Sequence, residues 1–210
     1  YGVKFYKRPN RLSSDKATND DFVLDFIENI NCDIIFQFLP TSPFVTSSDI
    51  REFYDMMMES DYDTLISTKD VQIECLYENQ PLNFKQKEKT PPSQSLEPVK
   101  AYACGLMAWE CDKFIENMGL FNSAYHGGNG KTGFFSISGF SSVDIDTVDD
   151  FMLAERIVDS INSTEYIEPE YYDPELHSGV HSEVHVPSIL RNDGVEKDNY
   201  KEENKQSHIF

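Results

Sequence analysis

Basic residues are scarce in this chain, which has 18 Lys and Arg against 37 Asp and Glu and a formal net charge of −19. Because nucleic acids and anionic membrane surfaces attract basic patches, this balance argues against a general affinity for either. Long apolar runs are also missing, since none approaches the ~18 residues that a membrane-spanning helix needs. The sequence therefore predicts neither a nucleic-acid partner nor a membrane partner.

Cysteine is sparse as well. The four cysteines, Cys32, Cys75, Cys104 and Cys111, are scattered and form no CxxC pair. We interpret them as reduced thiols, which are typical of a cytoplasmic protein.

The chain does contain enough apolar residues for one domain with a sizeable core, since 39% of its 210 residues are hydrophobic. Predicted helices and strands alternate along it. Helices are expected at 17–30, 47–60, 110–119 and after 147, and strands at 33–39, 63–68, 71–78, 99–109 and 130–139. The continuous apolar strands are typical of a sheet covered on both faces, and we expect the run at 33–39 to be a central strand. The pattern predicts an α/β fold with a doubly wound, mostly parallel sheet.

Two segments interrupt this pattern. Residues 71–99 become polar and rich in proline, and we interpret them as an excursion from the sheet. Residues 162–210 are acidic and irregular, which indicates a tail or a linker after a domain at 1–161.

Four aspartates stand close together in the segment SSVDIDTVDDFMLAERIV, residues 141–158. Thr147 and Asp150 have the spacing of a capping box, as do Thr18 and Asp21 before the first helix. Asp149 and Asp150 would also lie at the positive end of the helix dipole. These two carboxylates therefore have a sufficient structural explanation.

Asp144 and Asp146 precede the predicted helix and need another explanation. Residues i and i+2 of an extended chain point the same way, so both carboxylates would face one spot while Ile145 faces the core. Like charges so close repel unless a cation lies between them, and Mg²⁺ prefers hard oxygen ligands. The alternative is a pair of solvated loop aspartates.

Three motifs resemble the acylneuraminate (CMP-sialic acid) cytidylyltransferase family. They are KRPNRLSSDKAT at 7–18, LPTSPF at 39–44 and SVDIDTVDDFMLAE at 142–155. Their order and separation also fit, so the resemblance covers about residues 1–161. It implies the Rossmann-like fold of nucleotide-diphospho-sugar transferases.

The resemblance also implies a reaction, in which CMP is transferred from CTP to a nine-carbon sugar acid and pyrophosphate is released. Asp144 and Asp146 would then be the catalytic residues that hold Mg²⁺. Nucleotide binding is assigned by the same matching to Arg8, Ala17 and Asn19, and substrate binding to Thr41 and Ser42.

Several positions depart from the family's pattern, and they concern the sugar. Leu39 replaces a Gln that touches the sugar, and Gln37 lies two residues earlier on the same face. Tyr102 and Cys104 replace the Arg and Asn of an R-P-N-G segment, and Lys100 is a candidate cation nearby. The substrate is therefore sialic acid or a relative, such as a legionaminic-type, pseudaminic-type or deaminated acid.

The family's N-terminal strand and its glycine- and basic-rich triphosphate loop have no counterpart here. We expect an N-terminally truncated member without its first βα unit, which alone does not turn over CTP. We also expect a homodimer, because the family dimerises through an excursion like 71–99. That segment sets Ile73, Leu76, Leu82 and Phe84 among polar neighbours.

Two other functions fit part of the pattern. A glycosyltransferase can hold a nucleotide sugar through an Asp-x-Asp motif, although that motif usually lies in the middle of the domain. A degenerate, non-catalytic module of the same fold is the third hypothesis, and Leu39 keeps it open.

Overall fold

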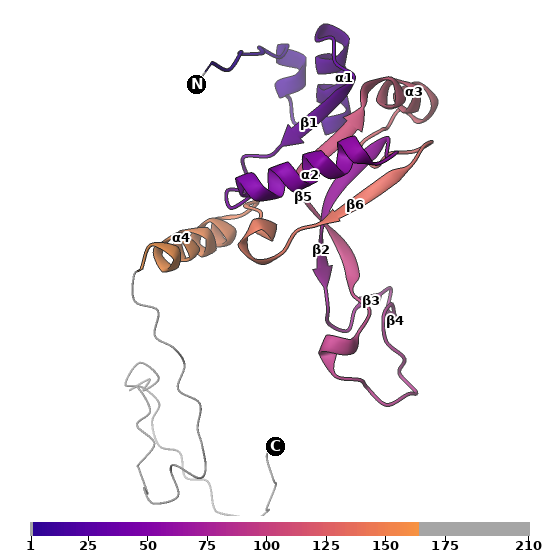
Figure 1. Ribbon diagram of the computed structural model, residues 1–210, viewed down its shortest axis with the longest axis vertical. Helices are drawn as coiled ribbons and strands as arrows, with labels where there is room; N and C mark the ends of the chain where they lie inside the picture. The colour runs from indigo at the N-terminus through magenta and orange to yellow at the C-terminus, as the bar shows by residue number, and fades with distance from the viewer. Residues whose placement is uncertain (1, 164–210) are drawn as a thin grey trace, which may run out of the picture. The chain divides into compact units, whose positions relative to one another are not determined.

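The computed structural model describes residues 2–163 (Figure 1). The predicted acidic tail at 162–210 lies outside the described residues except for its first two positions.

A four-stranded sheet forms the centre of the described region, in the order β1, β5, β2, β6. The strands are β1 (Ile34–Phe38), β2 (Thr64–Val71), β5 (Val99–Glu110) and β6 (Thr132–Ser136). β5 runs antiparallel to β1 and to β2, whereas β6 runs parallel to β2. Three strands therefore share one direction and β5 opposes them, so the predicted α/β class is confirmed with a mixed sheet.

Helices cover both faces of the sheet (Figure 1). α1 (Asn19–Asn29) and α3 (Cys111–Phe121) pack on one face, where Val23, Ile66, Met107, Trp109 and Phe114 are buried together. α2 (Ser47–Glu59) packs on the other face, where Phe53, Met57, Leu65, Leu106 and Ala108 form a second cluster. Because neighbouring residues of a strand point to opposite faces, Leu65 and Ile66 belong to different clusters.

Capping boxes begin three of the helices. Thr18, Thr46 and Thr147 each accept a hydrogen bond from the backbone N–H three residues later, and the aspartate there bonds back. The predicted boxes at Thr18 and Thr147 are confirmed. The last of these helices, α4 (Val148–Asn162), buries Ala154 and Ile157.

Two local predictions are wrong. The run 71–78 is not one strand, because β2 ends at Val71 and the chain then forms a small hairpin of β3 (Leu76–Tyr77) and β4 (Gln80–Pro81). Glu78 and Asn79 turn the chain there with φ values of 47° and 62°. The run at 33–39 is not a central strand within residues 2–163, since β1 pairs only with β5 and is mostly half-buried.

The excursion at 71–99 projects from the sheet as an arm (Figure 1). Asn83 holds it together, since its side chain accepts a bond from Cys75 N at 2.8 Å and donates to the carbonyl oxygens of Ile73 and Glu97. Short 3-10 helices lie at η1 (Asn10–Ser13), η2 (Ser93–Ser95) and η3 (Gly139–Ser142).

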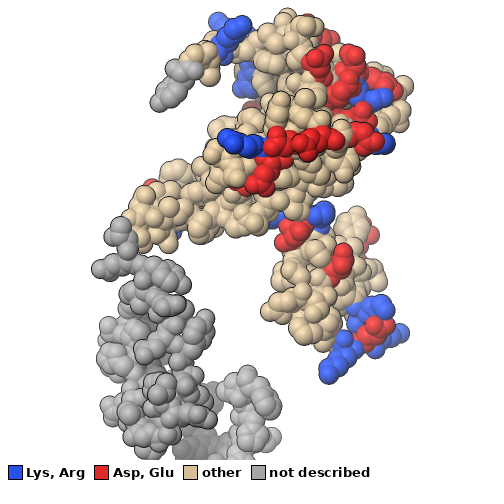
Figure 2. Space-filling model, viewed as in Figure 1, with Lys and Arg blue, Asp and Glu red and all other residues tan. Residues whose placement is uncertain are grey.

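Charged side chains are unevenly distributed over this face of the molecule. Figure 2 shows acidic side chains along α2 and near α1 and α3, and basic side chains at the far end of the arm. None of the helices in residues 2–163 combines the length and the apolar character needed to cross a bilayer.

Candidate functional site

Two of the three sequence motifs are in contact near the end of β1. They are the segment at 39–44, which we name the PTSP loop, and the aspartate segment at 142–155. Ser42 Oγ donates a hydrogen bond to Asp144 Oδ1 at 3.3 Å. The backbone N–H of Ile145 bonds to the carbonyl of Thr41 at 2.9 Å, and that of Leu39 bonds to the carbonyl of Gly105 at 3.1 Å. The PTSP loop is therefore fastened both to β5 and to the segment that carries the aspartate pair.

Gly105 permits the close contact between β5 and the PTSP loop. A Cβ atom at this position would lie 2.8 Å from Ser42 Oγ and 3.0 Å from Ser42 Cβ. Such distances are too short for non-bonded carbon, so any larger residue must displace Ser42. Cys104 just before it adopts a left-handed conformation with φ 56°. Asn tolerates that conformation best among non-glycine residues, which fits the sequence match of Cys104 with an Asn.

Asp144 and Asp146 line one hollow of about 490 Å³, which we name the aspartate hollow. Lys69, Tyr102, Cys104 and Asp150 also line it. Ile145 lies between the two aspartates in sequence but lines a separate, more apolar hollow beside Pro43 and Phe44. The two aspartates therefore line one hollow and Ile145 another, while Ile145 is half-buried and belongs to neither core cluster.

The three carboxylates of the aspartate hollow differ in their hydrogen bonds. Asp150 is committed to the start of α4, because it accepts bonds from the backbone and side chain of Thr147 and from Asp146 N. The bonds from Thr147 lower the pKa of Asp150 below its ordinary value. Asp144 accepts one bond from Ser42, and the Asp146 carboxylate accepts none from residues 2–163. Asp144 and Asp146 thus retain oxygen lone pairs that accept no hydrogen bond from the described residues.

These lone pairs fit a hard cation such as Mg²⁺, which takes one or two carboxylates and completes its octahedron with other oxygens. No group of three or more His, Cys, Asp or Glu is arranged as a metal site in the described part of the chain. A cation bound by Asp144 and Asp146 would therefore share its remaining positions with water or ligand oxygens.

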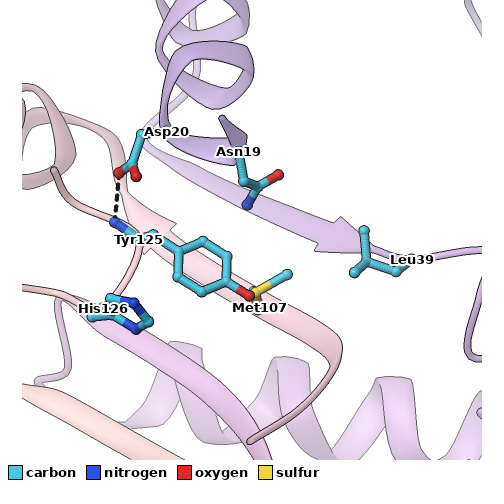
Figure 3. Close-up of a pocket in the computed structure, with 6 residues that line it drawn as sticks. All are labelled: Asn19, Asp20, Leu39, Met107, Tyr125 and His126. Atoms are coloured by element: carbon cyan, nitrogen blue, oxygen red, sulfur yellow. Dashed lines mark hydrogen bonds between the residues drawn. The ribbon is translucent and has the colours of Figure 1, made fainter. Parts of the chain in front are cut away.

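A second hollow, of about 350 Å³, is lined by Asn19, Asp20, Leu39, Met107, Tyr125 and His126 (Figure 3), and we name it the amide hollow. Asn19, which lines the hollow, is paired with Gln37 of β1 through two amide hydrogen bonds of 2.9 Å. Asp20 accepts bonds from the backbone N–H groups of Ala124 and Tyr125, which fixes the loop after α3 against α1.

Aromatic side chains connect the two hollows. Tyr102 in the aspartate hollow lies 5.4 Å from His126, and His126 lies 4.8 Å from Tyr125 in the amide hollow, both measured between ring centroids. The Tyr125 hydroxyl donates to Cys104 Sγ at 3.4 Å. Burial raises the pKa of both Tyr102 and Tyr125 above the ordinary value, which disfavours the charged phenolate at both positions.

Other candidate residues lie outside the two hollows. Arg8 is exposed and its guanidinium lies 5.6 Å from the centre of the Phe22 ring on α1. Ala17 N bonds to the carbonyl of Ser14 in the turn before α1. Lys100 is bonded to Asp70 at 2.9 Å and to Ser136 at 2.7 Å. The ligand contacts expected for these three residues stay predictions.

Sequence reasoning did not single out several residues that line the hollows, among them Lys69, Asp20, Tyr125 and His126. Asp20 looks like an ordinary acidic residue in the first turn of a helix, and the segment around Tyr125 and His126 reads as a polar turn. Lys69 follows the predicted strand at 63–68 and comes just before the excursion at 71–99, and nothing else in the sequence indicates that it lies near the aspartates.

No family model matches the chain. One similar solved structure is the 4-diphosphocytidyl-2C-methyl-D-erythritol synthase from Anaerococcus prevotii DSM 20548, with a TM-score of 0.48 and 9% identity over 69% of this chain and 65% of that one. Another is a CMP:2-keto-3-deoxy-manno-octonic acid synthetase complexed with CTP, with a TM-score of 0.47 and 12% identity over 70% of each chain. This likeness is coarse, and the chemistry of the site rests on its own residues.

Proposed function

We propose that this chain belongs to a cytidylyltransferase that transfers CMP from CTP to a nine-carbon sugar acid of the sialic acid type. One observation carries the proposal. The PTSP loop and the aspartate segment, which resemble the same family separately, are bonded together through Ser42 and Asp144. A chance match of unrelated loops has no reason to place these two segments in direct hydrogen-bond contact.

The amide hollow suits the cytidine base in this proposal. Asn19 supplies an amide group that can both donate and accept hydrogen bonds and that Gln37 orients, and Tyr125 and His126 supply aromatic faces. Gln37 itself is assigned to the sugar. Burial raises the pKa of Tyr125, whose hydroxyl donates to Cys104 Sγ. Arg8 and Ala17 complete the proposed nucleotide site through the resemblance alone.

The aspartate hollow suits the reacting groups. An oxygen of the sugar hydroxyl forms a bond to the α-phosphorus while the bond to the β-phosphate oxygen breaks, and pyrophosphate and the hydroxyl proton are released. Mg²⁺ held by Asp144 and Asp146 would neutralise the charge that builds on the phosphoryl oxygens. Ser42 orients Asp144, and Thr41 fixes the backbone of Ile145 between the two aspartates.

The proposal extends to the state of the protein in the cell, which is a cytoplasmic homodimer formed through the arm at 71–99. Ile73, Leu76 and Leu82 of the arm are 61%, 59% and 56% exposed in the single chain. Apolar side chains so exposed on an ordered arm favour a second copy as their cover.

The test measures pyrophosphate release by the natural full-length protein with CTP, Mg²⁺ and a panel of nine-carbon sugar acids. We expect release that needs both the sugar acid and Mg²⁺, and that falls when ATP, GTP or UTP replaces CTP. Consumption of a nucleotide sugar instead of CTP would support the Asp-x-Asp glycosyltransferase. The absence of both activities and of CTP binding would support the non-catalytic module.

A further inference from the structure

We propose that Lys69 binds the carboxylate of the sugar acid in the aspartate hollow, and that it thereby selects acidic sugars over neutral ones. This inference rests on the proposed function and assigns one side chain of the same site. Lys69 is the one Lys or Arg among the described residues that line the hollow. Three carboxylates, those of Asp144, Asp146 and Asp150, line it as well.

The strand pairing explains why Lys69 and not Lys100 serves the hollow. Lys69 lies opposite Ala101 on β5, and Lys100 lies opposite Asp70 on β2. Lys100 forms an ion pair with Asp70 and a hydrogen bond with Ser136, so its ammonium group already has two partners. The sequence alone favoured Lys100 as the candidate cation, because strand register and ion pairs are invisible there.

Lys69 has no such partner within residues 2–163. Its ammonium group makes no ion pair and no side-chain hydrogen bond with any described residue, and its side chain is exposed. An exposed lysine is ordinarily free, and this alone would mean little. Here the lysine belongs to the lining of the hollow in which the proposed substrate would place its carboxylate.

The balance of charges favours the sugar carboxylate over a phosphate of CTP. In the proposed complex, the α-phosphoryl oxygens would have the cation at Asp144 and Asp146 as their direct partner. The carboxylate of the sugar acid has no such partner, and the neighbouring aspartates would repel it. A lysine ammonium in the same hollow offsets that repulsion and supplies a charge-assisted hydrogen bond.

Tyr102 also lines the hollow, but it does not share a face of the sheet with Lys69, because it pairs with Thr68 and neighbouring residues of a strand point to opposite faces. Its hydroxyl is a neutral donor, and so is the weaker Cys104 thiol. The contact with the sugar carboxylate is therefore assigned to the Lys69 ammonium alone.

The experiment compares the natural full-length protein with its Lys69→Gln, Lys69→Arg and Lys100→Gln variants in pyrophosphate release. KM is measured separately for CTP, for a sialic acid and for the methyl ester of that acid. We expect Lys69→Gln to raise KM for the acid on the order of 10- to 100-fold, as for loss of a bond to a charged group, with KM for CTP unchanged. Lys69→Arg should recover most of this loss, and Lys100→Gln should raise KM for the acid much less than Lys69→Gln does.

The methyl ester removes the charge from the substrate instead of the protein. The unchanged protein should prefer the acid to the ester, and Lys69→Gln should lose that preference. If KM for the acid stays the same in Lys69→Gln, the assignment of Lys69 is wrong while the proposed function stands. If KM for CTP rises instead, Lys69 binds a phosphate and the assignment is again wrong. If the unchanged protein uses no sugar acid, the proposed function and this inference both fail.

Discussion

Ser42 Oγ donates a hydrogen bond to Asp144 Oδ1 across 3.3 Å, although 102 positions separate the two residues in the chain. Ser42 is only 6% exposed, so the packing of its neighbours fixes the position of its hydroxyl group. This bond joins the loop after β1 to the segment before α4. A substitution that displaces Ser42 should therefore also change the position of the Asp144 carboxylate.

Replacing Gly105 by Ala should disturb this bond through simple overlap, because the new Cβ would lie 2.8 Å from Ser42 Oγ. We expect a loss of about 1–3 kcal/mol in the free energy of unfolding, as for other overpacked sites, together with lower turnover. Chemical denaturation and pyrophosphate release measure the two effects.

Two further variants make the cause specific. Ser42→Gly in the Gly105→Ala background removes the overlapping atoms, so it should restore part of the stability but not the turnover. Gly119→Ala on α3 is the control, because a Cβ there meets nothing within 4 Å and helix propensity favours alanine. Equal destabilisation by Gly105→Ala and Gly119→Ala would show that the contact with Ser42 does not matter.

The capping box of α4 should make stability depend on acid pH. Thr147→Ala removes a helix cap and should cost about 1 kcal/mol at neutral pH. Hydrogen bonds from Thr147 lower the pKa of Asp150 below its ordinary 3.8, so this stabilisation is present above that pH and is lost as the pH falls through the folded value. The difference in thermal midpoint between the unchanged protein and Thr147→Ala should therefore shrink below pH 3.8.

Ser160→Ala serves as the control on the same helix, because the Ser160 hydroxyl makes no hydrogen bond within residues 2–163. It should leave the midpoint nearly unchanged at every pH. A Thr147→Ala deficit that stays constant down to strongly acidic pH would contradict the role given to the Asp150 carboxylate.

The arm should carry the dimer contact. Replacing Ile73 and Leu82 together by Ser should shift the protein toward the monomer in light scattering, because both side chains are more than half exposed and lose the apolar area that a second copy would cover. Leu120→Ser on α3 is the matched control, since Leu120 is 58% exposed but lies away from the arm. A monomer before any substitution would refute the arm as a dimer contact.

Local signals in the sequence predicted most of the elements. Thr18 and Thr147 marked helix starts because the capping box is a chemical motif that needs only neighbouring residues. The strand at β5 was equally clear from its apolar run. The sequence did not predict that β5 runs antiparallel to its neighbours, because a buried strand has the same apolar pattern in parallel and antiparallel pairs. The two errors, at 33–39 and 71–78, have the same origin, since position in a sheet and the turn at Glu78 depend on distant or backbone geometry.

The candidate site divides in the same way. Spacing predicted that Asp144 and Asp146 face one side, and the resemblance brought in Asn19, Gln37 and Ser42, although their ligand roles stay predictions. The amide hollow depends on the loop that carries Tyr125 and His126, and Asp20 fixes that loop from a helix more than a hundred positions away. No local pattern contains that information. Lys69 was hidden for the same reason.

The central claim is that Asp144 and Asp146 act through a bound cation, whereas Asp149 and Asp150 serve the helix. The most direct measurement is pyrophosphate release by Asp144→Asn, Asp146→Asn and Asp149→Asn variants of the natural full-length protein over a range of Mg²⁺ concentrations, with thermal midpoints in parallel. We predict that the first two lose on the order of 10²–10³ in rate, since a lost metal ligand costs several kcal/mol of transition-state stabilisation, and that their midpoints barely change. Asp149→Asn should keep nearly full turnover. Full turnover by Asp144→Asn and Asp146→Asn at saturating Mg²⁺ would show that the pair is a solvated loop and would contradict the account.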